Sequence, residues 1–185
     1  MFRSERVELP TPRPATPEAV GCALQAVVGH FESERRVGIA FPAPIVDSIV
    51  LDSANISDQW IGMEGESFFE ELLYRPIALI NDADTAGLAE SRWGAARGVD
   101  GLVLLRTLGT GIGSAILHDG RLITNTDLGV TPFRGADIEQ YAAPSVMARD
   151  GIDEREWANR LNEVVGVFEL MLRPDVIVVT GGITA

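Results

Sequence analysis

The chain has 185 residues, of which 46% are hydrophobic, enough for one ordinary domain or two small ones with a buried core. Its formal net charge of -12 opposes association with nucleic acid or with an anionic membrane surface. All fifteen basic residues are arginines, so a phosphate loop of the Walker type, which requires a lysine, is excluded.

The N-terminal region combines an extended connection with a helix. Four prolines between residues 7 and 17 favour an extended backbone. Thr16 then suits an N-cap, and apolar residues recur at helical spacing as far as Phe31. Cys22 has apolar neighbours and is expected on the buried face of this helix. The sequence contains no run of eighteen apolar residues, which predicts a cytoplasmic protein.

The middle of the chain alternates strands with helices. Apolar runs predict strands at residues 37–41, 45–51 and 77–80. Helical spacing predicts a short helix over residues 68–73, and a composition rich in Ala, Leu, Glu and Arg predicts another over residues 83–97.

The C-terminal part continues this alternation. Strands are predicted at residues 101–106, 114–117 and 176–179, with a hairpin at Asp119-Gly120. A long amphipathic helix is predicted from about Asp153 to Leu172. Such an order favours a layered α/β sheet whose ligands bind at the carboxyl ends of the strands.

Asp82 follows one predicted strand and precedes a predicted helix. Its carboxylate can therefore project into a cleft and take a proton from a substrate hydroxyl during phosphoryl transfer, with Asn81 beside it to hold another hydroxyl. An aspartate here also suits the N-cap of the following helix, which contributes about 1 kcal/mol to stability. The Asn-Asp pair alone leaves both roles open.

Residues 107–114, Thr-Leu-Gly-Thr-Gly-Ile-Gly-Ser, follow directly on an apolar strand. Glycines allow backbone N–H groups to approach an anion, and the hydroxyls of Thr107 and Thr110 add further donors. We interpret the segment as a phosphate cradle. A glycine-rich β-turn is the alternative.

Three motifs together resemble a known family. They read Asn-Asp-Ala-Asp-x-Ala-Gly-Leu-Ala-Glu from residue 81, Leu-Gly-Thr-Gly-Ile-Gly-Ser-Ala from residue 108 and Asn-Thr-Asp-Leu-Gly from residue 125. The chain is similar to the ROK sugar kinases, most closely to the polyphosphate glucokinases. The resemblance extends over most of the chain, including residues 10–20 and the closing Thr180-Gly181-Gly182.

The resemblance implies an α/β, actin-like (ribonuclease H-like) fold of two lobes, here residues 1–83 and 84–185. It implies transfer of a phosphoryl group from polyphosphate or ATP, with Mg²⁺, to the 6-hydroxyl of glucose. Asp82 matches the catalytic base. The positions that match sugar-binding residues are Asn55, Asn81, Asp127 and Glu139, and those that match phosphate-binding residues are Thr107, Gly109, Thr110, Gly111, Gly113, Gly181 and Gly182. No metal ligand from the protein, no nucleic acid and no membrane partner is expected, and a homodimer is the implied assembly.

Two departures from the family motifs define an alternative function. The family's first phosphate loop, Asp-x-Gly-Gly-Thr, does not occur in this sequence, and we expect the fold to be truncated at both ends. The family's Glu-x-Gly-His motif here ends in Val130, which cannot hydrogen-bond a sugar hydroxyl. A noncatalytic sugar-binding remnant, or pseudokinase, is therefore the alternative. A ROK repressor would need a helix-turn-helix segment, which the first thirty residues do not offer.

A polyphosphate donor would need a local basic track despite the negative net charge. Five arginines close to the motifs in sequence are candidates, although surface solubility explains them equally well: Arg92, Arg97, Arg106, Arg121 and Arg134.

Overall fold

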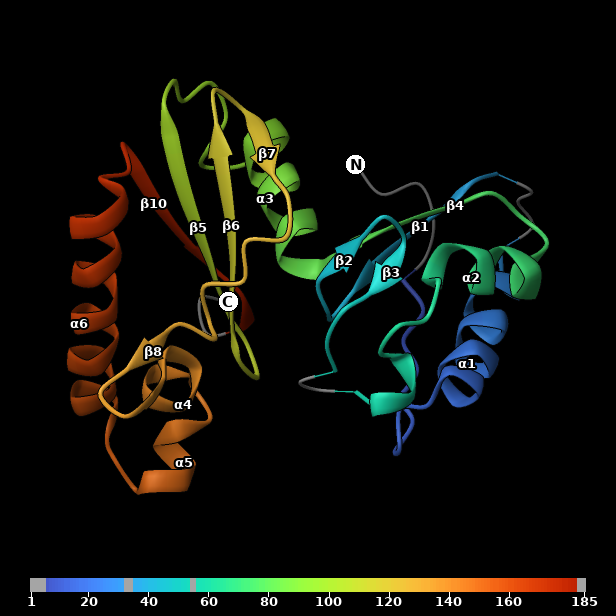
Figure 1. Cartoon of the computed structure of the whole chain (residues 1–185), viewed down its shortest axis with the longest axis horizontal. Coiled ribbons are helices and arrows are strands. Elements are labelled where there is room, and N and C mark those ends of the chain that lie inside the picture. Colours follow the sequence, from blue (N-terminus) through green and yellow to red (C-terminus); the bar gives the residue numbers. More distant parts are fainter. Residues whose placement is uncertain (1–5, 32–34, 54–55, 183–185) are drawn as a thin grey trace. The chain divides into compact units, whose positions relative to one another are not determined.

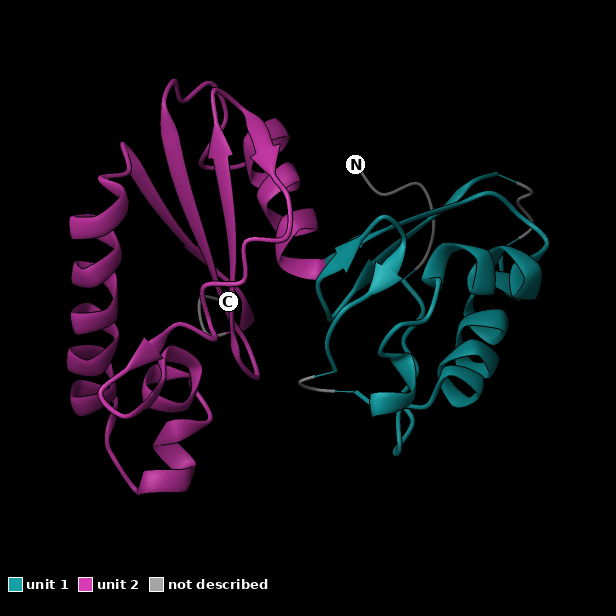
Figure 2. Cartoon of the chain, in the orientation of Figure 1, with its two compact units in different colours: residues 1–81 teal, residues 82–185 magenta. Residues whose placement is uncertain are grey.

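The computed structural model describes residues 6–31, 35–53 and 56–182. The chain forms two compact units, residues 1–81 and 82–185 (Figure 2). The division into two actin-like lobes after residue 83 stays a prediction.

In the first unit, the helices α1 (Pro17–Gly29) and α2 (Gly65–Leu73) accompany the parallel strands β1 (Val37–Phe41) and β4 (Ile77–Asn81) (Figure 1). The predicted cap at Thr16 is confirmed, since its hydroxyl accepts a hydrogen bond from the N–H of Ala19 at 3.2 Å. The core includes buried aromatic rings of Phe41, Trp60 and Phe69, where Trp60 ends the short 3-10 helix η1 (Asp58–Trp60).

Two expectations for this unit are wrong. Residues 45–51 form a small antiparallel hairpin of β2 (Ile45–Val46) and β3 (Ile49–Val50) in place of one strand. The chain reverses because Asp47 and Ser48 both adopt positive φ angles, 49° and 65°. Cys22 is exposed, whereas its neighbour Gly21 lies on the inward side of α1, against Leu72.

The second unit is built on a four-stranded sheet in the order β10-β5-β6-β7 (Figure 1). These strands are β5 (Leu102–Leu108), β6 (Ile112–His118), β7 (Arg121–Ile123) and β10 (Val176–Thr180). β10 runs parallel to β5, and the other neighbours are antiparallel. The β6–β7 turn confirms the hairpin predicted at Asp119-Gly120, where both φ angles are positive.

The sheet is covered on both faces. Helix α3 (Asp82–Trp93) packs on one face over Val103, Leu105 and Ala115, and α6 (Glu154–Leu172) packs on the other over Leu104. α3 ends four residues before the predicted position 97. α6 begins next to Asp153, as predicted, and the side chain of Asp153 caps it. The remaining elements lie between β7 and α6: β8 (Pro132–Phe133), β9 (Ala136–Asp137), α4 (Ile138–Ala142) and α5 (Val146–Asp150).

Candidate functional site

The N-terminus of α3 lies against the β5–β6 hairpin. Asp82 is the first residue of α3, and Ala83 behind it is buried. A Cβ atom built on Gly113 of β6 would lie 3.0 Å from the Cβ of Ala83 and would collide with the hydroxyl of Thr107. Only glycine at position 113 lets α3 and β6 approach this closely, so the Asp82 backbone is held at the end of the hairpin.

The glycine-rich segment connects two antiparallel strands. Thr107 and Gly113 face each other in the β5–β6 ladder, and the N–H of Gly109 donates to the carbonyl of Gly111 at 3.1 Å across the turn. The segment is therefore a turn between two strands, a geometry that both interpretations share. Gly109 and Thr110 are exposed at its tip. The phosphate role of these residues stays a prediction.

The C-terminal glycine pair lies at the same end of the sheet. Thr180 is in register with Thr107, so β10 and β5 end side by side. Gly181 has a φ angle of 115° and lies against the backbone of Leu108, where any side chain would collide. Gly182 follows as an exposed residue with open space around its Cα.

The segment after β7 carries Asp127. Hydrogen bonds with two buried polar residues hold the backbone of this segment in place. Ser114 of β6 donates from its hydroxyl to the carbonyl of Thr126 at 2.5 Å and accepts from the N–H of Leu128 at 2.8 Å. Asp84 of α3 accepts from the N–H of Asn125 at 2.9 Å. The sequence analysis singled out neither Ser114 nor Asp84 as a separate residue, although both lie inside the motifs.

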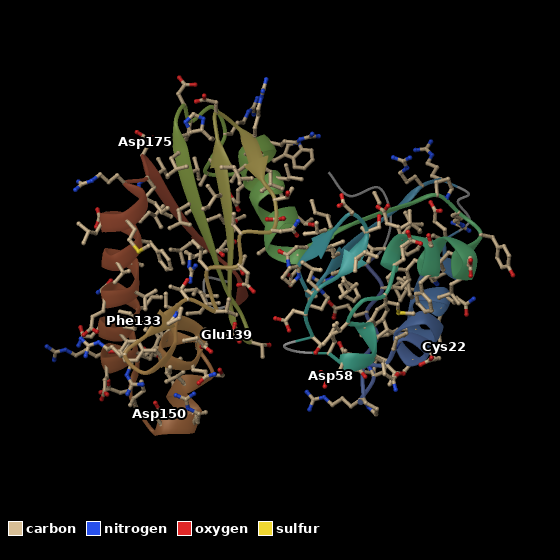
Figure 3. The ribbon with its side chains drawn as sticks, in the orientation of Figure 1. Cys22, Asp58, Phe133, Glu139, Asp150 and Asp175 are labelled. Atoms are coloured by element: carbon tan, nitrogen blue, oxygen red, sulfur yellow. The ribbon has the colours of Figure 1, made fainter. Side chains whose placement is uncertain are left out.

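Glu139 lies at the start of α4, close to the turn of the hairpin (Figure 3). Its carboxylate accepts from the N–H of Ile112 at 3.1 Å, and its own N–H donates to the carbonyl of Gly129 at 3.0 Å. A side chain at Gly111 would collide with this carboxylate. Glu139 therefore lies beside both the hairpin and the segment that carries Asp127.

Two acidic groups at the start of α3 have shifted pKa values. Burial raises the pKa of Asp82 above 3.8, the charge of Asp127 adds to this, and the N–H of Ala83, 2.8 Å from the carboxylate, opposes it. Burial also raises the pKa of Asp84, against the hydrogen bond from Asn125. The bond from Ala83 differs from N-cap geometry, in which the acceptor takes the N–H of the second or third helical residue. A carboxylate with a raised pKa is a stronger general base.

The remaining predicted positions are not all gathered here. Asn55 lies outside the described residues. The side-chain amide of Asn81 donates to the carbonyl of Ala43 at 3.3 Å, within the first unit. One arginine of the predicted basic track does not belong to a surface: Arg106 is only 2% exposed, because its strand is covered by α6. Arg92, Arg97, Arg121 and Arg134 are exposed, and Arg134 pairs with Glu163 at 3.0 Å.

Within residues 6–31, 35–53 and 56–182, no group of three or more acidic, histidine or cysteine side chains is arranged to hold a metal ion. Mg²⁺ in phosphoryl-transfer sites typically needs only one or two carboxylates together with the phosphates of the donor. The carboxylates of Asp82 and Asp127 are the candidates for that smaller requirement. The helices of the described part are all too short or too polar to cross a membrane.

Comparison with known proteins defines the class of this fold. The solved structure of an inorganic polyphosphate/ATP-glucomannokinase from Arthrobacter sp. strain KM superimposes with a TM-score of 0.95 at 39% identity, covering 99% of this chain and 75% of that chain. A ROK family glucokinase from Streptomyces griseus, in complex with glucose and AMPPNP, has the same fold with a TM-score of 0.79 at 23% identity, covering 94% and 74%. The predicted α/β fold of the actin-like sugar kinases is thus confirmed.

The sequence comparisons identify the family. The ROK family model matches residues 1–131. A polyphosphate glucokinase of Mycobacterium leprae (strain TN) is 39% identical over 181 residues, and one of Mycobacterium tuberculosis (strain CDC 1551 / Oshkosh) is 38% identical over the same length. The match covers 97% of this chain, 56% of the first relative and 68% of the second. The chain belongs to the ROK family.

Proposed function

We propose that the chain transfers a phosphoryl group from polyphosphate or ATP to the 6-hydroxyl of glucose, with Asp82 as the general base. The observation that carries the proposal is the place of Asp82. It begins α3 where that helix meets the glycine hairpin, and its carboxylate has a raised pKa. A base in this position is suited to accept the hydroxyl proton as the phosphoryl group arrives.

Other residues of the second unit supply the roles that this reaction needs. Asp127 and Glu139 are our candidates to accept hydrogen bonds from sugar hydroxyls, since both carboxylates lie near the hairpin. The exposed backbone of Gly109 and Thr110, with Gly181 and Gly182 at the same end of the sheet, is our candidate for the phosphate groups. Mg²⁺ bound to the donor phosphates would neutralise charge on the transferred group, with Asp82 or Asp127 at its side.

The relatives support this choice of substrates. The two mycobacterial proteins are polyphosphate glucokinases, and the Arthrobacter protein is a polyphosphate/ATP-glucomannokinase. These names favour glucose as acceptor and both donors as candidates. The same proposal includes a cytoplasmic location and a homodimer.

The test is a phosphoryl-transfer assay on the purified chain with glucose, Mg²⁺ and either ATP or polyphosphate, followed by detection of glucose 6-phosphate. Asp82→Asn should lower kcat by about 10²–10⁴-fold while the glucose KM changes little. Asp100→Asn, an exposed aspartate outside the site, is the matched control and should leave kcat unchanged. Equal rates for Asp82→Asn and the parent chain would refute the assignment of the base. Glucose binding without transfer from either donor would support the noncatalytic alternative.

The choice of donor has its own experiment. Polyphosphate held by several exposed arginines should lose affinity steeply as salt rises, because exposed charges are screened. ATP, held at fewer positions, should respond less. A comparison of donor KM at low and high salt distinguishes the two, and equal salt dependence would argue against a basic track of Arg92, Arg97, Arg121 and Arg134.

A further inference from the structure

Arg106 is an unusual residue for the middle of a buried strand. It occupies β5 on the face that also carries Leu104 and Leu108, and only 2% of its surface is exposed. Its guanidinium carbon lies 4.7 Å from the ring centroid of Phe168 in α6, a cation–π distance. The sequence analysis placed Arg106 only in a surface track, so this buried position needs another explanation.

The guanidinium is poorly satisfied by its surroundings. Among the residues that the structure describes, neither terminal nitrogen of Arg106 has a hydrogen-bond partner. A buried donor without a partner destabilises a fold, and a buried charge without a hydrogen-bonded partner does so more strongly. Hydrophobic residues surround the position, and one of them would serve stability better. The charge of Arg106 therefore needs an explanation other than a contribution to the stability of the fold.

The negative charges of two carboxylates act on this guanidinium, and both belong to segments attached to the neighbouring strand β6. Ser114 lies opposite Arg106 in the β5–β6 register, and its hydroxyl fastens Thr126 and Leu128, the residues on either side of Asp127. Glu139 accepts from the N–H of Ile112, which lies two residues before Ser114 and so on the same face of β6. The backbone thus directs Asp127 and Glu139 to the neighbourhood of one buried cation.

The electrostatics agree with this geometry. Burial lowers the pKa of Arg106 to about 10, while the negative charges of Asp127 and Glu139 act in the opposite direction. Arg106 therefore still carries its charge at neutral pH.

We propose that Arg106 is a positioning residue whose buried charge attracts the carboxylates of Asp127 and Glu139 and so holds them in place for hydrogen bonds to sugar hydroxyls. The part that concerns sugar rests on the proposed function. Arg106 itself is covered by α6 and acts through the two carboxylates, not on the reacting atoms.

The first experiment measures glucose binding by calorimetry together with thermal unfolding. Arg106→Met keeps the length of the side chain and its contact with Phe168 but removes the charge. We expect its glucose affinity to fall by about tenfold or more, with no decrease in Tm, because the cost of burying a guanidinium without hydrogen bonds has gone. Arg106→Lys restores a charge and should recover part of the affinity. Arg155→Met, an exposed arginine on α6, is the matched control and should bind like the parent chain. Unchanged affinity in Arg106→Met would overturn the inference.

The second experiment needs no ligand. In a double-mutant cycle of thermal unfolding, Glu139→Gln keeps an oxygen to accept from Ile112 but removes the charge that acts on Arg106. We expect it to lower Tm in the parent chain and to lower Tm by clearly less in the Arg106→Met background. Equal shifts in both backgrounds would overturn the inference. A parent chain that binds no glucose but shows this coupling would refute the proposed function while the positioning of Glu139 by Arg106 would stand.

Discussion

The two faces of the β5–β6 hairpin hold the candidate site in different ways. On the α3 face, small residues let backbones approach, since Gly113 packs against Ala83 and Gly87 against Ala115. On the α6 face, hydrogen bonds of Ser114 and of the Glu139 carboxylate hold the neighbouring segments against the hairpin. Close packing fixes where Asp82 begins, whereas hydrogen bonds and charge fix where Asp127 and Glu139 lie.

The base on the α3 face and the sugar-binding carboxylates on the α6 face should therefore respond differently to substitution. Changes of volume should matter most on the α3 face, where the position of the base depends on contact. Changes of polarity should matter most on the α6 face, where the sugar-binding carboxylates depend on hydrogen bonds.

The largest effect is expected on the α3 face. Gly113→Ala adds a methyl group 3.0 Å from Ala83 and in collision with Thr107, so the free energy of unfolding should fall by about 2–3 kcal/mol. Gly109→Ala is the matched control in the same segment, because its Cα faces open space, and should change stability by about 0.5 kcal/mol or less. Urea unfolding measures both. Similar losses in the two variants would contradict the close packing.

A somewhat smaller effect is expected on the α6 face. Ser114→Ala removes a hydroxyl that makes two hydrogen bonds. The carbonyl of Thr126 and the N–H of Leu128 each lose the hydrogen bond to that hydroxyl. The free energy of unfolding should fall by about 1–2 kcal/mol. Ser91→Ala, whose hydroxyl donates only to a carbonyl of its own helix, is the control and should cost less. A loss for Ser114→Ala no larger than for the control would refute its fastening role.

Asp84 tests how a buried carboxylate behaves on the α3 face. Its pKa is raised in the folded state, so the protonated form favours folding and that stabilisation is lost as pH rises through the folded-state pKa. Asp84→Asn keeps an acceptor for the N–H of Asn125 and has no charge to bury. Its Tm should exceed that of the parent chain at pH 7, and the difference should shrink toward pH 4. A difference that is constant with pH would contradict the shifted pKa.

The smallest effect concerns the segment between the two faces. Val130 is 54% exposed, so a larger polar side chain fits there without repacking. Val130→His restores the histidine of the family's motif and should raise glucose affinity about threefold to tenfold in calorimetry. Val130→Leu is the control of similar size without a donor and should not raise it. An affinity gain in both variants would show that polarity at this position is not the cause.

Much of the fold could be predicted from the sequence because its signals are local. The cap at Thr16, the apolar spacing of α6 and the Asp119-Gly120 turn each mark an element that the structure contains. The hairpin at residues 45–50 was missed because Asp47 and Ser48 take up positive φ angles without a glycine to signal them. The predicted end of the helix at residue 97 is later than the observed end of α3 at Trp93. Ala and Arg after Trp93 favour helix, although Gly94 follows it directly.

The site could be predicted only in part, for a physical reason. Residue chemistry indicated Asp82 and the glycine segment 107–114, whereas only the resemblance to the ROK family indicated Asp127 and Glu139. The burial of Arg106 and Asp84 depends on which helix covers which strand, and one-dimensional patterns do not contain that information. One signal was available: Arg106 interrupts the apolar series of Leu104 and Leu108 at strand spacing, which marks an inward-facing position.

The most direct test of the account is a crystal structure of the chain with glucose bound. We predict that a carboxylate oxygen of Asp82 lies about 2.6–3.2 Å from a glucose hydroxyl, with Glu139 or Asp127 bonded to another hydroxyl of the same sugar. Glucose bound away from the hairpin, or an Asp82 carboxylate engaged only with the backbone of α3, would contradict the account.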